Sequence, residues 1–125
     1  MPAQYVIDVN GRIVKTTFKG VVTYQQVADL AAALARDEGF DPEFSELLMF
    51  EPGTDVQLQF SDFQHLSRLD PFSKSALRAL VVPSRGVLYG VARMYQTFRD
   101  SSNVCIFEST EAALFWLSTR DRRAC

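Results

Sequence analysis

The spacing of apolar residues changes along this chain, and the change limits the folds that it can adopt. Over residues 4–9 and again over residues 12–19, apolar and polar residues alternate, which is typical of β-strands with one buried and one wet face. Asn10-Gly11 separates the two stretches and predicts a two-residue type I′ turn, because both central residues of such a turn need positive φ. After Gly20 the apolar spacing becomes helical. The chain therefore begins as an antiparallel hairpin that leads into a helix.

Three further strands are predicted from continuous apolar runs over residues 46–51, 77–82 and 104–107. Runs of this kind are typical of parallel strands that are covered on both faces. Helices are predicted between and after these runs, each preceded by a residue suited to cap its N-terminus. The predicted caps are Thr23 (in a capping box with Gln26), Ser61 (in a box with Gln64), Ser84, and Ser109 or Thr110.

Helical periodicity also predicts which faces of the last two helices are buried. The predicted buried residues of the helix over residues 85–99 are Val87, Val91, Met94, Tyr95 and Phe98. Those of the last helix, which ends near residues 118–119, are Ala113, Leu114 and Leu117, with Trp116 at the border.

Together these elements predict an α/β fold, in which a β-hairpin is followed by αβαβαβα. The sheet is expected to be five-stranded, mixed and mostly parallel, with four main helices. No repeat or linker divides the sequence, so residues 1–125 are expected to form a single domain, with residues 119–125 as a disordered or helical tail. A chain of 125 residues buries roughly two thirds of the surface that it exposes when unfolded, which is enough for a hydrophobic core.

The composition argues against several classes of protein. A net charge of −2 gives no electrostatic surface for nucleic acid. Residues 1–4 lack the basic and apolar regions of a secretion signal, and no apolar stretch approaches the ~20 residues of a membrane span. The two cysteines, Cys105 inside an apolar run and Cys125 at the end, do not predict a disulfide framework. We therefore expect a cytoplasmic protein.

The sequence contains no recognisable catalytic apparatus, cofactor motif or metal site. A nucleophile–base pair needs a serine or cysteine near a histidine, but His65 is the only histidine and no local pattern joins it to Cys105. Glycine-rich phosphate loops and clustered metal ligands are also lacking. We expect a non-catalytic protein without a cofactor or metal. The carboxylates that the fold could still bring together are Glu51, Asp55, Asp62 and Asp70.

Ligands of open α/β sheets bind beyond the carboxyl ends of the strands. The polar residues predicted at those ends are Glu51, Ser84 with Arg85, and Ser109. Residues 83–86 join a strand end to a helix N-terminus, where an acyl or phosphate anion would meet N–H donors and a basic side chain. Helix capping and an exposed arginine explain the same residues, and we favour that interpretation.

Tyr89, Arg93 and Gln96 are predicted to lie opposite the buried stripe of their helix, as candidate interface residues. Gly90 lies beside them, and a glycine inside a helix costs about 1 kcal/mol relative to alanine. Its presence suggests close approach by another helix of the same fold or by a partner chain.

Phe115 does not fit the buried face of the last helix, and beside Trp116 it would form an exposed apolar patch. Both are therefore candidate interface residues. The chain also holds 10 phenylalanines, more than a core of this size needs. An apolar pocket or an oligomer interface would accommodate the excess.

In element order, length and two local stretches, the chain resembles the SpoIIAA-like fold that STAS domains share with other small bacterial proteins. The stretches are Val81-Val82-Pro83-Ser84 and Tyr89-Gly90-Val91-Ala92-Arg93-Met94-Tyr95. The resemblance covers nearly the whole chain and is greatest to the uncharacterised bacterial members. It implies a fold and says almost nothing of function.

In the anti-sigma-factor antagonists of that superfamily, a serine within Asp-Ser-Ser-Gly is phosphorylated where a helix begins after the third strand. Residues 60–63 correspond to that stretch, so the resemblance implies Ser61 as a phosphoacceptor. Asp62 departs from the pattern, because small residues are expected there and a second negative charge disfavours a phosphate. Capping of the helix by Ser61 is the simpler interpretation.

Three functions therefore remain open. The first is a non-catalytic interaction or small-ligand module that forms a homodimer or binds another protein. The second is a switch regulated by phosphorylation of Ser61. The third is the binding of an apolar or acyl ligand in a pocket between the helices and the sheet.

Overall fold

Seven strands and four helices follow one another along the residues that the computed structural model describes, 3–83, 85–99 and 103–120. The strands are β1 (Ala3–Asp8), β2 (Ile13–Phe18), β3 (Val21–Thr23), β4 (Ser45–Phe50), β5 (Asp55–Gln57), β6 (Arg78–Val81) and β7 (Val104–Phe107). The helices are α1 (Tyr24–Ala35), α2 (Phe60–Leu69), α3 (Val87–Phe98) and α4 (Thr110–Thr119).

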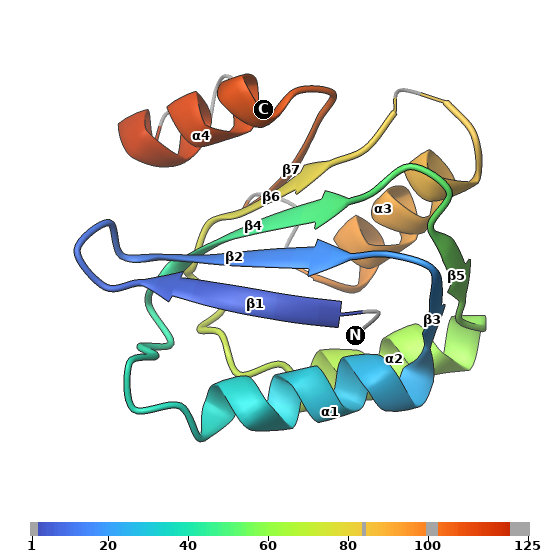
Figure 1. Ribbon diagram of the computed structural model, residues 1–125, viewed down its shortest axis with the longest axis horizontal. Helices are drawn as coiled ribbons and strands as arrows, with labels where there is room; N and C mark the ends of the chain where they lie inside the picture. Colours follow the sequence, from blue (N-terminus) through green and yellow to red (C-terminus); the bar gives the residue numbers. More distant parts are fainter. Residues whose placement is uncertain (1–2, 84, 100–102, 121–125) are drawn as a thin grey trace.

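Five of the strands form one sheet in the order β1-β2-β4-β6-β7. β1 runs antiparallel to β2, whereas every other pair of neighbours is parallel, so the sheet is mixed and mostly parallel. Helices lie on both of its faces (Figure 1). The predicted fold class, a hairpin followed by alternating helices and strands around a five-stranded sheet, is confirmed.

The two faces of the sheet are covered unequally. α1, α2 and α3 lie on one side, which we call the three-helix face, whereas α4 packs on the other side against β4, β6 and β7 (Figure 1). The core contains Leu48 and Leu80 on the three-helix face, and Leu47 and Trp116 on the α4 face. At the β1 edge the α4 face is open to solvent, as the 66% exposure of Val6 shows. The predicted wet face of the hairpin is thus confirmed.

β3 and β5 form a separate two-stranded parallel sheet, which no sequence pattern predicts. Each follows a strand of the main sheet after a glycine with positive φ, Gly20 at 64° and Gly53 at 82°. The Asp55 amide donates to the Gly20 carbonyl oxygen at 2.8 Å and joins the two bends. Strands of 3 residues are too short to show a period, so the sequence alone does not reveal them.

The turn between β1 and β2 is longer than predicted. The last residues to pair are Asp8 and Ile13, so the loop extends beyond Asn10-Gly11 on both sides. Its residue with positive φ is Arg12, at 55°. The Gly11 amide donates to Asp8 Oδ1 at 2.9 Å and closes the wider loop. The predicted two-residue type I′ turn is therefore wrong.

Two predicted helix caps are confirmed. At the start of α1, the Thr23 amide donates to Gln26 Oε1 at 2.9 Å, as a capping box requires. At the start of α4, the Ser109 hydroxyl oxygen accepts from the Ala112 amide at 3.1 Å. Both caps satisfy amides that would otherwise lack partners in the first turn.

The predicted cap of α2 is wrong. Gln59 takes the N-cap position instead of Ser61, and its amide donates to Asp62 Oδ2 at 2.8 Å. The predicted box of Ser61 with Gln64 is therefore not formed. A carboxylate in the first turn also interacts favourably with the positive end of the helix dipole, which favours Asp62 in this role.

α3 and α4 are each rotated from the predicted orientation. In α3, Val87 is 77% exposed and Ala92 is fully buried. In α4, Trp116 is 1% exposed whereas Leu114 is 36% exposed. The predictions that Val87 and Leu114 face the core are wrong. Apolar residues surround much of both helices, so periodicity alone does not determine the buried face.

Candidate functional site

A pair of opposite charges lies buried between neighbouring strands on the three-helix face. Glu46 in β4 and Arg78 in β6 are partners in the strand register. Arg78 Nε and Nη2 donate to Glu46 Oε1 at 3.0 and 2.7 Å. The other carboxylate oxygen, Oε2, accepts from Thr16 Oγ1 at 3.2 Å. The side chains of Arg78 and Glu46 are 4% and 5% exposed, so water does little to screen their interaction.

Two further charged residues extend this pair: Asp70, which follows α2, and Arg99, which follows α3. Arg78 Nη1 donates to Asp70 Oδ2 at 2.6 Å, and Arg99 Nη1 lies 2.5 Å from the same oxygen. Asp70 Oδ1 accepts from the Phe72 amide at 3.0 Å. We call Glu46, Asp70, Arg78 and Arg99 the charge cluster. It joins two strands of the sheet to the ends of two helices.

Burial shifts the pKa values of the ionisable side chains in this region. It raises the pKa of Glu46 above its ordinary value, although Arg78 acts in the opposite direction. It also raises the pKa of the Tyr95 phenol, which therefore stays neutral at physiological pH. Burial acts to lower the pKa of Arg78, but its negatively charged neighbours outweigh burial and raise that pKa: Tyr95 where its phenol is ionised, and Glu46 and Asp70. The Arg78 guanidinium therefore stays charged.

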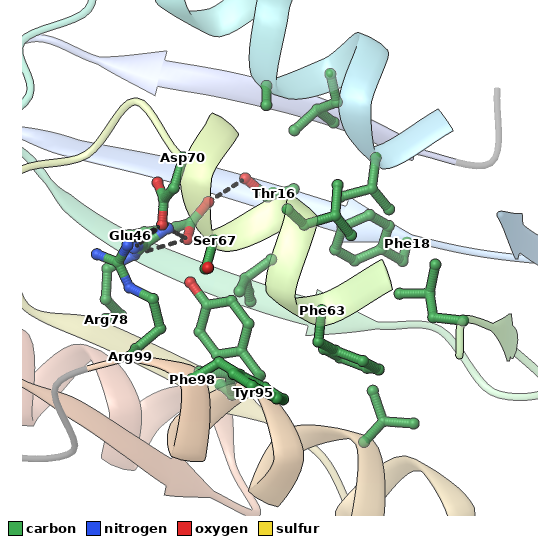
Figure 2. A pocket seen from close by; sticks show the side chains of 18 of the residues that line it. Thr16, Phe18, Glu46, Phe63, Ser67, Asp70, Arg78, Tyr95, Phe98 and Arg99 are labelled. Carbon is green, nitrogen blue, oxygen red and sulfur yellow. Dashed lines mark hydrogen bonds and ion pairs between the residues drawn. The ribbon is translucent and has the colours of Figure 1, made fainter. Parts of the chain in front are cut away.

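A pocket of about 120 Å³ lies between the three-helix face and α1, α2 and α3 (Figure 2). Its polar lining gathers at one end, where the charge cluster meets Thr16, Ser67 and Tyr95. The rest of the lining is predominantly apolar. It includes Val27 and Leu30 from α1, Leu48 from β4, Val56 from β5 and Phe63 from α2.

Two buried polar atoms at the polar end, Tyr95 Oη and Arg99 Nε, have no hydrogen-bond partner among the described residues. The Tyr95 hydroxyl points toward Ser67 and the charge cluster (Figure 2). The Arg99 side chain is only 10% exposed. Leaving a buried polar group unpaired costs about 1–3 kcal/mol. A ligand atom that completed these hydrogen bonds would recover part of that cost.

Aromatic rings form one wall of the pocket. Phe63 and Phe98 both line it, and their rings stack with centroids 6.4 Å apart. Phe60 packs edge-on against Phe98 with centroids 5.0 Å apart, and it is 60% exposed. Phe60 therefore lies on the solvent side of this wall.

Glu51, Arg85 and Ser109, predicted to bind a ligand at the carboxyl ends of the strands, do not line this pocket, and neither does Ser61 at the start of α2. Glu51, Ser61 and Arg85 are exposed. The Ser109 side chain caps α4, and Ser84 lies outside the described residues. A binding or phosphoacceptor role for these residues stays a prediction.

Two of the three predicted interface residues of α3 are half-buried. Tyr89 packs against the core of the three-helix face, so its predicted position opposite the buried stripe is wrong. Gln96 Nε2 donates to the Val104 carbonyl oxygen at 2.8 Å, and Gln96 Oε1 accepts from Arg93 Nη1 at 3.2 Å. Tyr89, Arg93 and Gln96 line a shallow groove beside β7. Their role in an interface stays a prediction.

Gly90 is exposed, and a Cβ atom added there would meet nothing within 4 Å. Packing against another helix of the same fold therefore does not account for this glycine. A partner chain at Gly90 stays a prediction.

The two adjacent aromatic residues of α4 have opposite environments. Phe115 is 68% exposed, whereas Trp116 is 1% exposed and packs against Phe107 with ring centroids 5.6 Å apart. The predicted exposed patch of Phe115 beside Trp116 is wrong, because Trp116 fills the core under the helix. Phe115 alone keeps the exposure that an interface role requires.

His65 and Cys105, the two residues of the nucleophile–base alternative, do not line the pocket. His65 is exposed and contacts the Tyr24 ring edge-on, with centroids 6.4 Å apart. Cys105 is buried and disulfide-bonded, so the expectation that the cysteines form no disulfide is wrong. Within residues 3–83, 85–99 and 103–120, no three His, Cys, Asp or Glu side chains are grouped so that they could hold a metal ion.

Sequence reasoning missed Glu46, Arg78 and Arg99 as candidate site residues. A usable signal exists for the first two, since each lies in an apolar run predicted to be covered on both faces. A charge in such a run must find a partner inside the fold. Asp70 is the one predicted carboxylate that lines the pocket, and it pairs with Arg78 and Arg99 instead of with other loop carboxylates.

Comparison with known proteins finds no matching family model, no matching curated protein and no matching solved structure. Among the described helices, none has the length and apolar character needed to cross a membrane.

Proposed function

We propose that this protein binds a small amphipathic molecule in the pocket beside the charge cluster. The observation that carries the proposal is the pairing of an apolar lining with two buried, unpartnered polar atoms, Tyr95 Oη and Arg99 Nε, at one end. Ligand pockets in proteins are commonly apolar with a few placed polar groups that orient the ligand. An apolar tail would lie against Leu30 and Leu48, with the polar head at Tyr95 and Arg99.

The volume limits the size of the ligand. A cavity of roughly 150 Å³ can hold benzene, so a cavity of about 120 Å³ suits a molecule of about that size or a short aliphatic chain. Small ligands gain at most about 1.5 kcal/mol per non-hydrogen atom. We therefore expect modest affinity, with dissociation constants between micromolar and millimolar.

The pocket chemistry supports binding over turnover. Its lining contains no cysteine or histidine among the described residues. Ser67 Oγ donates to the Gln64 carbonyl oxygen at 2.7 Å, so no general base activates it. The charged groups are held in mutual ion pairs, which fixes their positions.

The proposal is tested by titrating the protein with 1-pentanol and following backbone amide NMR shifts. We expect saturable shifts at residues that line the pocket, such as Leu48 and Phe63. A matched pair of variants locates the site. Ala31 on α1 lines the pocket, so Ala31→Leu fills part of it, whereas Ala32 is exposed on the same helix.

Ala31→Leu should weaken 1-pentanol binding at least about tenfold, which corresponds to about 1.4 kcal/mol. Ala32→Leu should leave the binding unchanged. Amide shifts that do not saturate, or equal effects of the two variants, would overturn the proposal.

A further inference from the structure

We infer that the pocket selects ligands with an uncharged polar head, such as an amide or an alcohol, over carboxylates of the same size. This inference rests on the proposed function and concerns the same site. It follows from the charge balance of the cluster and from which of its hydrogen-bonding atoms are already occupied.

The charge cluster is already neutral as a whole. Arg78 and Arg99 carry two positive charges, and Glu46 and Asp70 carry two negative charges when ionised. Tyr95 adds no charge, since burial keeps its phenol protonated. A carboxylate ligand would therefore bring a net negative charge into a buried region that has no excess positive charge to compensate it.

The carboxylate oxygens of the cluster are also occupied. Glu46 Oε1 accepts two hydrogen bonds from Arg78, and Glu46 Oε2 accepts one from Thr16. Asp70 Oδ2 is shared by Arg78 and Arg99. The protein supplies these ion pairs itself, so an incoming carboxylate would compete with Glu46 and Asp70 for the same guanidinium groups.

The pocket's fully buried polar atoms that lack a partner among the described residues are one N–H donor, Arg99 Nε, and one hydroxyl, Tyr95 Oη. An N–H and a hydroxyl can both donate to a single carbonyl or hydroxyl oxygen. The hydroxyl can instead accept from a ligand N–H or O–H. This set of atoms suits a neutral head that offers an oxygen acceptor, and it does not require a charge.

Pentanamide and pentanoate test the inference, because they have the same number of non-hydrogen atoms and differ in charge. At about pH 7.5 pentanoate is ionised. We expect the dissociation constant of pentanamide to be at least about tenfold lower than that of pentanoate. Equal binding, or tighter binding of pentanoate, would overturn the inference while leaving 1-pentanol binding intact. If 1-pentanol and both probes fail to bind, the proposed function itself fails.

A pair of variants tests the charge argument directly. Glu46→Gln keeps an oxygen for Arg78 and leaves the cluster with one excess positive charge. The ratio of the dissociation constant of pentanoate to that of pentanamide should therefore fall at least about tenfold. Glu38→Gln removes the same charge from an exposed residue that does not line the pocket, so it should leave the ratio unchanged. A shift of equal size in both variants would overturn the charge argument. If Glu46→Gln does not fold, the ratio measured on the unaltered protein still decides the inference.

Discussion

Glu46 and Arg78 are paired positions on neighbouring parallel strands, and Arg78 Nη2 lies 2.7 Å from Glu46 Oε1. The strand pairing itself thus brings the carboxylate and the guanidinium together on one face of the sheet. Their burial makes the pair sensitive to the loss of Arg78, because the Glu46 carboxylate would then stay buried without an ion-pair partner.

Replacement of Arg78 should strongly destabilise the fold. Arg78→Met leaves Glu46 without its ion-pair partner and should lower the free energy of unfolding by about 3–5 kcal/mol, measured by urea denaturation. Arg68 is exposed on α2, and Arg68→Met should change stability by no more than about 0.5 kcal/mol. Similar losses in the two variants would contradict the importance of the buried pair.

The pH dependence of stability should report on Glu46. Burial raises its pKa in the folded protein above the value of about 4.3 expected in an unfolded chain. The folded state then binds the proton more tightly, so this group contributes stability that is present at low pH and is lost as pH rises through the raised pKa. Relative to Glu46→Gln, the unaltered protein should therefore lose free energy of unfolding as pH rises from about 4.

Urea denaturation of both proteins across this pH range measures the difference. A difference that moves in favour of the unaltered protein as pH rises would mean that Arg78 outweighs burial at Glu46 and would contradict the prediction.

Tyr95→Phe should separate stability from binding. The hydroxyl is buried without a partner, so its removal should leave the free energy of unfolding equal or raise it by up to about 1 kcal/mol. The same change should raise the dissociation constant of 1-pentanol about fivefold, as expected for one lost hydrogen bond of about 1 kcal/mol. A large loss of stability would show that the hydroxyl has a structural partner.

Gly90 and Gly86 should respond oppositely to alanine. Gly90 lies inside α3 with open space around its missing Cβ, so Gly90→Ala should stabilise the protein by about 0.8–1.0 kcal/mol. Gly86 caps the same helix at φ 97°, ψ −170°, a backbone region that is almost restricted to glycine, so the prediction that Ser84 caps this helix is wrong. Gly86→Ala should cost about 1–3 kcal/mol. Thermal or urea unfolding of the two variants gives the comparison, and a destabilised Gly90→Ala would contradict the open environment.

The adjacent aromatic residues of α4 should differ in the same kind of measurement. Trp116→Ala creates a cavity in the core and should cost about 3–5 kcal/mol, whereas Phe115→Ala should change stability by no more than about 0.5 kcal/mol. Equal losses would contradict the burial of Trp116. If Phe115 supports the predicted self-association, sedimentation analysis should show weaker association in Phe115→Ala.

Sequence patterns were sufficient for the parts of the fold that depend on local periodicity. Continuous apolar runs mark the strands that both layers of helices cover, and the Thr23–Gln26 box marks the start of α1. The rotation of α3 and α4 was not predictable in this way, because apolar residues surround both helices. Packing against the sheet selects Ala92 and Trp116 over Val87 and Leu114.

The pocket was predictable only in outline. An excess of phenylalanine indicates that a cavity or an interface is present, and Phe63 and Phe98 do line the pocket. Its polar end depends on strand order and register, which bring Glu46 and Arg78 together across 32 positions of sequence. No local pattern carries that information.

The pairing of Glu46 with Arg78 also bears on how the strands find their alignment. A slip of one residue between β4 and β6 would turn Arg78 toward the α4 face, whose hydrophobic core cluster contains Leu47, Ala79 and Trp116. The guanidinium would lose its carboxylates and lie against indole and aliphatic carbon. This one side chain therefore raises the free energy of the misaligned sheet. The buried charge thus favours the native strand register over the shifted one.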